Sequence, residues 1–203
     1  MSYVGGRSPQ VGAGGFTLGG GTSPFANKYG WALDNVYEYE VVLANGTVVT
    51  ASETLNPDLY FALRGGGSNF GIVTAFTVRV FQQGRVMSSR ATYVPDQTER
   101  ALDNAFELFT KPGLADDENM GFDMYYAYNQ AEGEFILTGS EWYEKPVASP
   151  PVCDAIRQVP TTRRSTTLAT MANLTSVSQQ LHRSSLVRNA FCVAFSPFAN
   201  PKS

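Results

Sequence analysis

The order of apolar and polar residues predicts a strand–strand–helix–strand arrangement in the first part of the chain. β-Forming residues fill Tyr37–Leu43 and return at Thr47–Thr50. Between these runs, Asn45 and Gly46 are typical of a type I′ turn, in which both residues take a positive φ. The two runs therefore predict an antiparallel hairpin.

A short helix and another strand are predicted after the hairpin. Asn56 is favoured at a helix N-cap and Pro57 at the first helical position, so the helix is predicted over Asn56–Leu63. Gly65 follows it, where a C-terminal glycine ends a helix. Apolar residues then alternate over Ile72–Phe81, which predicts a strand.

The second part of the chain predicts helices laid on a mostly antiparallel sheet, the α+β class. A change of composition at Gln82-Gln83-Gly84 predicts a domain boundary, giving domains 1–83 and 84–203. Three helices are predicted. The first begins with a capping-box-like Asp96–Glu99 and runs through Phe109, and the second covers Pro151–Gln158. The third runs from an Asn173 cap to about Arg188. Predicted strands are Gly121–Tyr128, Glu134–Trp142 and Phe191–Phe195, and predicted loops are Pro146–Pro151 and Thr161–Thr167.

Composition and charge exclude two classes of partner. The 203 residues are 43% hydrophobic and 16% charged, which is ordinary for a folded globular protein. The net charge is −3 and basic runs are absent, which excludes a nucleic-acid-binding surface. Because no apolar run is long enough to span a bilayer, we expect no membrane partner either.

Cysteine and histidine are too few to predict a metal site. Cys153 and Cys192 lack metal-ligand spacing, and two buried thiols are favoured over a single disulfide. His182 is the only histidine, so zinc sites and histidine-based triads are poorly supplied. We therefore predict no metal.

Glycines gather in two clusters, Val11–Ser23 and Arg64–Val73. Glycine clusters occur where φ must be positive, or where a ligand or another backbone leaves no room for a Cβ. Bare amide groups in such a loop bind anionic oxygens, which predicts a phosphate-bearing cofactor held from two sides. The alternative is that these glycines only let strands and helices pack closely.

Two familiar nucleotide-binding fingerprints are absent from both clusters. Gly12–Thr17 and Gly65–Phe70 each lack the last glycine of G-x-G-x-x-G. Lys28 is not part of the G-K-[ST] sequence of a Walker loop. A generic glycine-rich nucleotide-binding module is therefore the weaker interpretation.

The order and spacing of the motifs resemble one flavoprotein family more closely. In sequence order these motifs are Gly14–Gly21, Lys28–Gly30, Asp34–Val36, Glu40–Gly46, Asn56–Leu59, Leu63–Gly67 and Asn69–Thr74. Together they resemble the second half of the FAD-binding domain of the vanillyl-alcohol oxidase / p-cresol methylhydroxylase (PCMH-type) superfamily. The berberine-bridge-enzyme-like oxidoreductases, in their fungal form, are the most similar members. The resemblance covers about Val4 to Phe81, and the remainder is similar to the start of the family's substrate domain.

The resemblance implies an FAD cofactor and assigns its contacts. It implies that residues 1–83 are the C-terminal half of a PCMH-type FAD-binding domain and residues 84–203 a partial α+β substrate-binding domain. The first glycine-rich segment, Gly14–Gly21, would approach the flavin and the pyrophosphate. The main chain of the second segment, Gly71–Val73, would run along the FAD near its adenine end. The implied residues are Gly14, Gly15, Leu18, Gly19, Gly20 and Gly21 in the first segment and Gly71, Ile72 and Val73 in the second. Asp34 and Asn35 would shape the turn before the hairpin, and Asp34 is expected to be a turn or capping acid rather than a catalytic one.

Departures from the family pattern bear on how FAD is held. Members with doubly attached flavin carry Cys-Pro where this chain has Ser8-Pro9, so the resemblance implies a non-cysteinyl FAD. The family's histidyl attachment site belongs to an earlier subdomain, so the resemblance implies that this site is absent from the present chain. Because the glycine-rich segment begins close to Met1, we expect a fragment that binds FAD weakly or not at all by itself. Its exposed edges would favour a partner chain or self-association.

The implied function is an FAD-dependent oxidoreductase. Hydride would pass from an alcohol-bearing or amine-adjacent carbon of a small-molecule substrate to the flavin, and dioxygen would reoxidise it. The alternative is a truncated, catalytically inert family member that acts by interaction. Tyr126 and Tyr128 share a face of a predicted strand that also holds Tyr125. Core packing or sheet surface is the favoured explanation for them, so no catalytic residue is assigned. Secreted and cytoplasmic locations both stay open.

Overall fold

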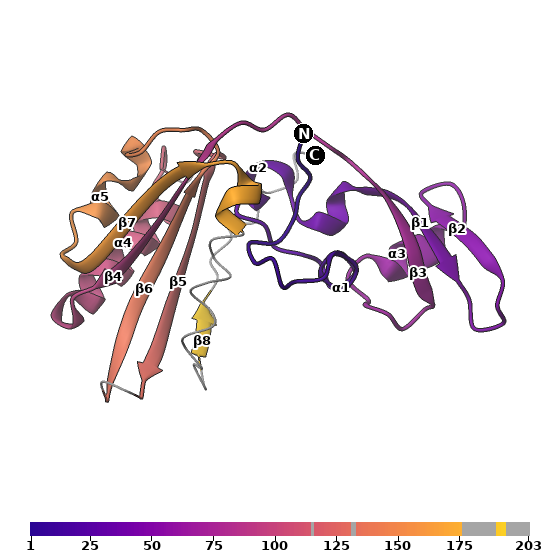
Figure 1. The fold of residues 1–203 in the computed structure, drawn as a ribbon, viewed down its shortest axis with the longest axis horizontal. Helices are drawn as coiled ribbons and strands as arrows, with labels where there is room; N and C mark the ends of the chain where they lie inside the picture. Colours follow the sequence, from indigo (N-terminus) through magenta and orange to yellow (C-terminus); the bar gives the residue numbers. More distant parts are fainter. Residues whose placement is uncertain (115, 131–132, 176–189, 194–203) are drawn as a thin grey trace. The chain divides into compact units, whose positions relative to one another are not determined.

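The chain folds into two compact units, each with its own hydrophobic core. The computed structural model describes residues 1–114, 116–130 and 133–175 and the backbone of residues 190–193 (Figure 1). Unit 1 is Met1–Gln83 and unit 2 is Gly84–Ser203. Both units combine helices with antiparallel sheet, which is the predicted α+β class.

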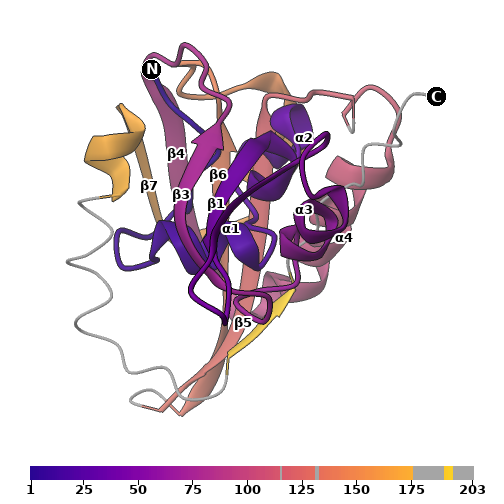
Figure 2. The same cartoon turned by 90° about the vertical axis from the view of Figure 1, so that its right-hand side faces the viewer.

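Unit 1 contains a three-stranded antiparallel sheet in the order β2-β1-β3, as Figure 2 shows for β1 and β3. The helix α3 lies in sequence between β2 and β3, so the predicted strand–strand–helix–strand order is confirmed. Two short helices and a 3-10 turn precede the sheet. The elements are α1 (Ala13–Leu18), α2 (Ala26–Tyr29), η1 (Ala32–Asn35), β1 (Val36–Val42), β2 (Val48–Ser52), α3 (Pro57–Leu63) and β3 (Ile72–Val78).

The β1–β2 hairpin is present, but its predicted type I′ turn is wrong. Gly46 has a φ of 81°, whereas Asn45 is not among the residues with positive φ. The Gly46 amide donates to the Leu43 carbonyl at 2.9 Å, and the Leu43 amide donates to Thr47 at 2.9 Å. The connection is thus a three-residue loop, a β-turn closed by a left-handed glycine.

The helix α3 begins and ends at the predicted residues. It begins at Pro57 and ends at Leu63, and Gly65 has the positive φ (99°) expected just after a helix. Asn56 precedes the helix in a left-handed conformation and its side chain does not cap it. The side-chain amide of Asn56 instead donates to the Thr50 carbonyl at 2.8 Å, which ties the helix start to β2.

Tyr39 lies at the centre of the core of unit 1. Its ring packs against those of Tyr60 from α3 and Phe76 from β3, with centroids 5.7 and 5.5 Å away. The Tyr60 hydroxyl donates to the buried Val36 carbonyl at 2.6 Å. Aromatic rings and one buried hydrogen bond therefore fasten α3 to β1.

Unit 2 contains a five-stranded antiparallel sheet in the order β7-β4-β6-β5-β8. The chain passes from β4 through α4 to β5, and from β6 through α5 to β7, each time skipping one strand position, which is the split β-α-β arrangement. The elements are β4 (Val86–Tyr93), η2 (Pro95–Gln97), α4 (Thr98–Thr110), β5 (Met120–Asn129), β6 (Glu134–Tyr143), η3 (Pro151–Cys153), α5 (Asp154–Arg157), β7 (Thr161–Ala169) and β8 (Ala190–Val193).

The helices α4 and α5 cover one face of this sheet (Figure 1). Ala101, Ala105 and Leu108 on α4 and Ile156 on α5 are buried against the apolar side chains of β4, β5 and β6. The apolar spacing of α4 matches one face of a helix. Because successive side chains of a strand point to opposite faces of the sheet, the face without helices carries a different set of side chains.

Several predictions for unit 2 need correction. The predicted loop Thr161–Thr167 is the edge strand β7, which has an almost wholly polar sequence and therefore lacks the apolar alternation that marks a strand. The capping box predicted at Asp96–Glu99 is wrong, because α4 begins at Thr98 without a side-chain cap. Asn173 lies within a helical stretch, 171–175, rather than at its cap, and the rest of that predicted helix lies outside the described residues.

Other predictions for unit 2 match the observed elements. The strands predicted at Gly121–Tyr128 and Glu134–Trp142 are β5 and β6, and the helix predicted at Pro151–Gln158 is η3 followed by α5. The predicted strand Phe191–Phe195 corresponds to β8, although residues 194 and 195 lie outside the described part. The strand β4 has no counterpart among the predictions.

Candidate functional site

The two glycine clusters of unit 1 meet in the fold, although residues 24–63 lie between them in sequence. The Gly67 amide donates to the Leu18 carbonyl at 3.1 Å. The carbonyls of Gly20 and Gly21 accept from the amides of Leu33 and Ala32 at 3.0 and 2.9 Å. Backbone hydrogen bonds thus join both clusters and the turn before β1 into one structure.

The first cluster is not the continuous loop that the sequence predicts, because it contains the helix α1. The Phe16 amide donates to Gly12 and the Gly19 amide to Gly15, both at 3.0 Å. A glycine inside a helix costs roughly 1 kcal/mol relative to alanine. A Cβ added at Gly14 would approach nothing closer than the Phe76 ring at 4.0 Å, and one added at Gly15 would meet nothing within 4 Å. Packing among the described residues therefore does not explain Gly14 and Gly15.

Gly20 and Gly21 have a structural explanation. Their φ values are 108° and 77°, a region that other residues rarely adopt. A Cβ at Gly20 would lie 2.7 Å from the Trp31 ring, and one at Gly21 would lie 2.7 Å from both Ala32 and Phe16. For these two residues, close packing by itself requires glycine.

The remaining predicted residues of the first cluster differ in burial. The Leu18 side chain is buried in the core of unit 1, so only its main chain is available to a ligand. Gly19 is exposed, and a Cβ there would come within 3.1 Å of the Gly15 carbonyl oxygen. Contacts of this segment with a cofactor would thus be made by main-chain atoms.

The second predicted segment, Gly71-Ile72-Val73, enters the strand β3. Gly71 has a φ of 148°, and a Cβ there would lie 2.7 Å from the Val41 side chain and 2.8 Å from the Val42 carbonyl oxygen. Close approach to β1 therefore explains this glycine. The Ile72 side chain is 70% exposed, whereas Val73 packs against the core.

Asp34 and Asn35 shape the turn before β1, as predicted. One carboxylate oxygen of Asp34 accepts from the Trp31 amide and the other from the Arg64 guanidinium, both at 2.9 Å. The Asn35 side-chain amide donates to the carbonyls of Tyr29 and Trp31 at 2.7 and 2.9 Å. Asp34 is thus a capping acid, as predicted.

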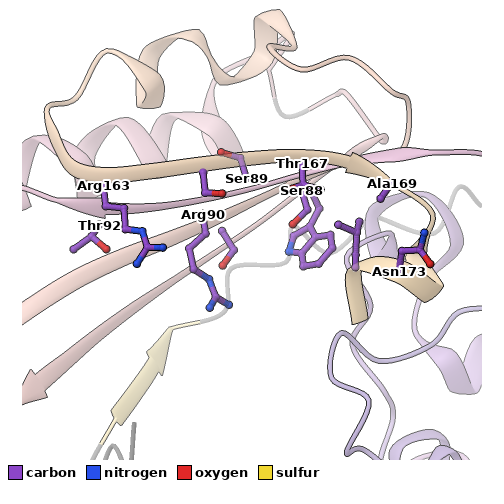
Figure 3. Close-up of a pocket in the computed structure, with 12 residues that line it drawn as sticks. Ser88, Ser89, Arg90, Thr92, Arg163, Thr167, Ala169 and Asn173 are labelled. Carbon is purple, nitrogen blue, oxygen red and sulfur yellow. The ribbon is translucent and has the colours of Figure 1, made fainter. Parts of the chain in front are cut away.

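Unit 2 contains a cavity of about 400 Å³ on the sheet face opposite α4 and α5 (Figure 3). Its lining comes from alternate positions of β4, β6 and β7, with Ser89 of β4 as an addition, and from the short helical stretch after β7. Most of the strand side chains carry a hydroxyl or a guanidinium group. The lining residues are Ser88, Ser89, Arg90, Thr92, Ser140, Trp142, Arg163, Ser165, Thr167, Ala169, Asn173 and Leu174.

The cavity is cationic at one end and apolar at the other. Arg90 lies opposite Ser140 on one side and Ser165 on the other, and Thr92 lies opposite Arg163. Figure 3 shows the side chains of Arg90 and Arg163 extending from the same face of the sheet. Further along, Trp142 pairs with Ser88 in the register, and Ala169 and Leu174 complete the apolar end.

A buried carboxylate holds β7 in place on the helix-covered face. Glu141 on β6 is 1% exposed and pairs with Arg157 of α5 at 2.6 Å and with Arg164 of β7 at 2.5 Å. Burial, reinforced by the nearby Glu141, raises the pKa of the Tyr93 hydroxyl and of the Cys153 thiol. Cys153 is a free, buried cysteine as expected, whereas the side chain of Cys192 and all of His182 lie outside the described residues.

The tyrosines of β5 lie on the strand as predicted but do not line the cavity. Tyr126 stacks on Phe135 and Tyr128 meets the edge of the same ring, each with centroids 5.1 Å apart. Their shared face is thereby confirmed, and both side chains are partly exposed. The cavity residues were missed because β4 and β7 were not predicted, although Ser88, Arg90 and Thr92 alternate along the sequence.

Neither a metal-binding cluster nor a membrane-spanning helix occurs among the described residues. No group of three or more His, Cys, Asp or Glu side chains could hold a metal ion there. None of the helices in that same part of the chain is long and apolar enough to cross a membrane.

The chain is similar to known FAD-dependent proteins. Residues 2–52 match the family model described as "FAD binding domain", which spans α1, β1 and β2. The FAD-dependent monooxygenase tpcD of Cochliobolus heterostrophus is 64% identical over 83 residues, which cover 41% of this chain and 16% of that protein. The FAD-dependent monooxygenase FUP4 of Fusarium proliferatum is 37% identical over 184 residues, covering 87% of this chain and 34% of that protein. Over the matched residues the chain is therefore similar to FAD-linked oxidoreductases.

The solved structure of BBE-like 1 from Physcomitrella patens resembles the chain with a TM-score of 0.69 and 29% identity, over 88% of this chain and 38% of that one. In sequence the chain is similar to fungal FAD-dependent monooxygenases, and in fold it is similar to VAO-type and BBE-like flavoproteins. It spans about a third or less of the length of the curated relatives it matches.

Proposed function

We propose that this chain contributes to an FAD-dependent oxidoreductase that removes hydride from a carbon beside an alcohol oxygen or amine nitrogen of a small molecule. The observation that carries the proposal is the bare surface of α1. Gly14 and Gly15 cost helix stability without any packing need, and both lie within the segment that matches the FAD binding domain model. Close approach of a cofactor explains such glycines.

The main chain of unit 1 would hold the cofactor. The first segment offers the amides of Gly14 and Gly15 in the first turn of α1, with the main chain of Leu18 and Gly19–Gly21 beside them. Gly71–Val73 offers a second main-chain segment. FAD supplies the hydride acceptor when it is bound. Gly20, Gly21 and Gly71 would act indirectly, because their lack of a Cβ lets the surrounding turns and strands close.

The cavity of unit 2 would bind the substrate. Its hydroxyl and guanidinium groups can orient a polar substrate, and Trp142 offers an apolar surface that excludes water. Several relatives carry the name FAD-dependent monooxygenase, which supports dioxygen as the reoxidant. Ser8 stands where a cysteinyl attachment would need a thiol, so we propose a flavin without a cysteinyl bond.

Titration of FAD with the purified chain tests the proposal, with flavin fluorescence anisotropy as the signal. We expect weak but saturable binding, reduced by roughly tenfold or more in Gly15→Leu, because the added side chain fills the space reserved for the cofactor. Gly84→Leu is the matched control, since a Cβ at Gly84 also meets nothing within 4 Å and its φ is not positive. Equal binding by wild type and Gly15→Leu, or no saturable binding at all, would contradict the proposal.

The mode of attachment has a separate readout. Acid precipitation of the FAD complex should leave the flavin in the supernatant, because the chain lacks a cysteine near the glycine-rich segment. Flavin fluorescence in the precipitated protein would instead reveal a covalent bond.

A further inference from the structure

We propose that the cavity of unit 2 selects a substrate that carries an oxyanion, a carboxylate or a phosphate, attached to a flat apolar body. The proposal rests on the proposed function, in that it takes this cavity to be the substrate site. It is carried by two arginines that form no ion pair with any described residue and by the polarity that runs along the cavity.

Arg90 and Arg163 are set apart from the other arginines near them. Arg157 and Arg164 both form ion pairs with Glu141 on the helix-covered face. Within the described part of the chain, the ion pairs include neither Arg90 nor Arg163. Since side chains alternate along β7, Arg164 reaches Glu141 whereas its neighbour Arg163 faces the cavity.

Arg90 and Arg163 extend from neighbouring positions on the same face of the sheet. Arg163 pairs with Thr92 in the register, and Arg90 lies two residues before Thr92 on the same face of β4. They are therefore diagonal neighbours, which places their Cβ atoms roughly 7 Å apart. Two like charges at this spacing repel each other, and a bound anion removes that cost.

Hydroxyl groups beside the arginines complete an oxyanion site. Ser140 and Ser165 flank Arg90 on the two neighbouring strands, and Thr92 flanks Arg163. Guanidinium and hydroxyl donors together match the acceptor oxygens of a carboxylate or phosphate. A neutral substrate would leave both arginines unpaired in the cavity.

The other end of the cavity fits an apolar body. Trp142 lies two residues from Ser140 along the same face of β6, which is a separation of roughly 7 Å. Leu174 and Ala169 extend the apolar surface. A cavity of about 400 Å³ accommodates a bicyclic aromatic group with one anionic substituent.

Isothermal titration calorimetry on the full 203-residue chain tests this inference with three probes of one shape. These are 1-naphthoate, 1-naphthyl phosphate and the neutral 1-naphthamide. We expect both anions, or the one whose class is correct, to bind roughly tenfold or more tightly than the amide. The preferred anion distinguishes a carboxylate from a phosphate substrate.

Variants link the selectivity to the two arginines. Arg90→Gln and Arg163→Gln should each weaken binding of the anion about fivefold or more and leave binding of naphthamide unchanged. Arg100→Gln is the control, because this exposed arginine lies on α4, against the other face of the sheet. Circular dichroism checks that each variant is folded, and the comparison of probes on wild type needs no variant.

The inference would be overturned by equal binding of the anions and the amide, by no binding of any probe, or by anion binding that survives both arginine substitutions. The FAD titration separates this failure from failure of the proposed function. A chain that binds FAD but shows no preference for anions keeps the function and loses the inference. A chain that prefers the anions through Arg90 and Arg163 but does not bind FAD keeps the anion site and loses the function.

Discussion

Glu141 on β6 and Arg164 on β7 form an ion pair, with N and O 2.5 Å apart, that crosses over the intervening strand β4. The second carboxylate oxygen of Glu141 binds Arg157 of α5, whose Nη1 donates to the Ala148 carbonyl at 2.6 Å. The Glu141 carboxylate on β6 thus holds both the edge strand β7 and the helix α5. This arrangement fixes β7, which brings Arg163 and Ser165 to the cavity on the opposite face.

Substitution of Glu141 should strongly destabilise unit 2. Glu141→Gln leaves two guanidinium groups partly buried without a counter-charge, which costs roughly 3–5 kcal/mol in comparable buried pairs. Urea denaturation monitored by circular dichroism measures the change. The control is Glu107→Gln, whose partner Lys111 lies 3.6 Å away on the surface, and which should cost about 0.5 kcal/mol or less. A similar small loss for both variants would contradict the role given to Glu141.

Two glycine substitutions should move stability in opposite directions. Gly15→Ala places a methyl group in open space on a helix, so we expect a gain of up to about 1 kcal/mol in the free energy of unfolding. Gly21→Ala forces a non-glycine residue to a φ of 77° and a Cβ to within 2.7 Å of Ala32, so we expect a loss of about 1–3 kcal/mol. Thermal denaturation of both variants checks the signs. A gain in stability together with weaker FAD binding in Gly15→Ala would separate the cofactor-related glycine from the structural one.

Tyr60 and Tyr39 form a second matched pair. Tyr60→Phe removes the buried 2.6 Å hydrogen bond to the Val36 carbonyl and should cost roughly 1–2 kcal/mol. The Tyr39 hydroxyl is buried without a hydrogen-bond partner among the described residues, so Tyr39→Phe should be neutral or slightly stabilising. Chemical denaturation compares the two. A larger loss for Tyr39→Phe than for Tyr60→Phe would show that the hydroxyl of Tyr39 has a partner.

The stability of unit 1 should fall at high pH because of Tyr39. Burial, with Tyr60 beside it, raises the pKa of Tyr39 from 10.0 to about 12. Since the folded-state pKa lies above the unfolded one, the stabilisation is complete below pH 10 and is lost as the pH rises toward 12, by up to about 1.4 kcal/mol for each pKa unit. Unfolding measured between pH 9 and pH 12 should show a shallower fall in Tyr39→Phe. Equal pH dependence in wild type and variant would assign the fall to other groups, such as Tyr60, whose pKa burial also raises.

The sequence predicted unit 1 better than unit 2, for physical reasons. Apolar alternation and strong punctuation at Pro57 and Gly65 mark the elements of unit 1. The exact hairpin turn escaped prediction because Asn45 tolerates more than one conformation and the turn is decided by its closing bonds. A helix at Ala13–Leu18 was unexpected because glycine has low helix propensity.

The strand β7 and the cavity were beyond what local pattern could show. Thr161–Ala169 is polar on both faces, and it is a strand because it pairs with β4 and is anchored through Arg164. Arg90 and Arg163 are 73 positions apart in sequence and meet only through this pairing. The glycine clusters pointed to the correct family, yet only the geometry separates Gly15, which faces open space, from Gly21, which packing requires.

An antiparallel bridge joins Ser2 to Phe81 in unit 1. Each residue donates its amide to the other's carbonyl, at 2.8 and 2.9 Å, and the neighbouring Tyr29 stacks on Phe81. The chain at Ser2 and the segment that follows β3 therefore lie side by side. The unit is suited to circular permutation, with a short linker joining Ser2 to Phe81 and new termini opened in the exposed turn at Ala44-Asn45.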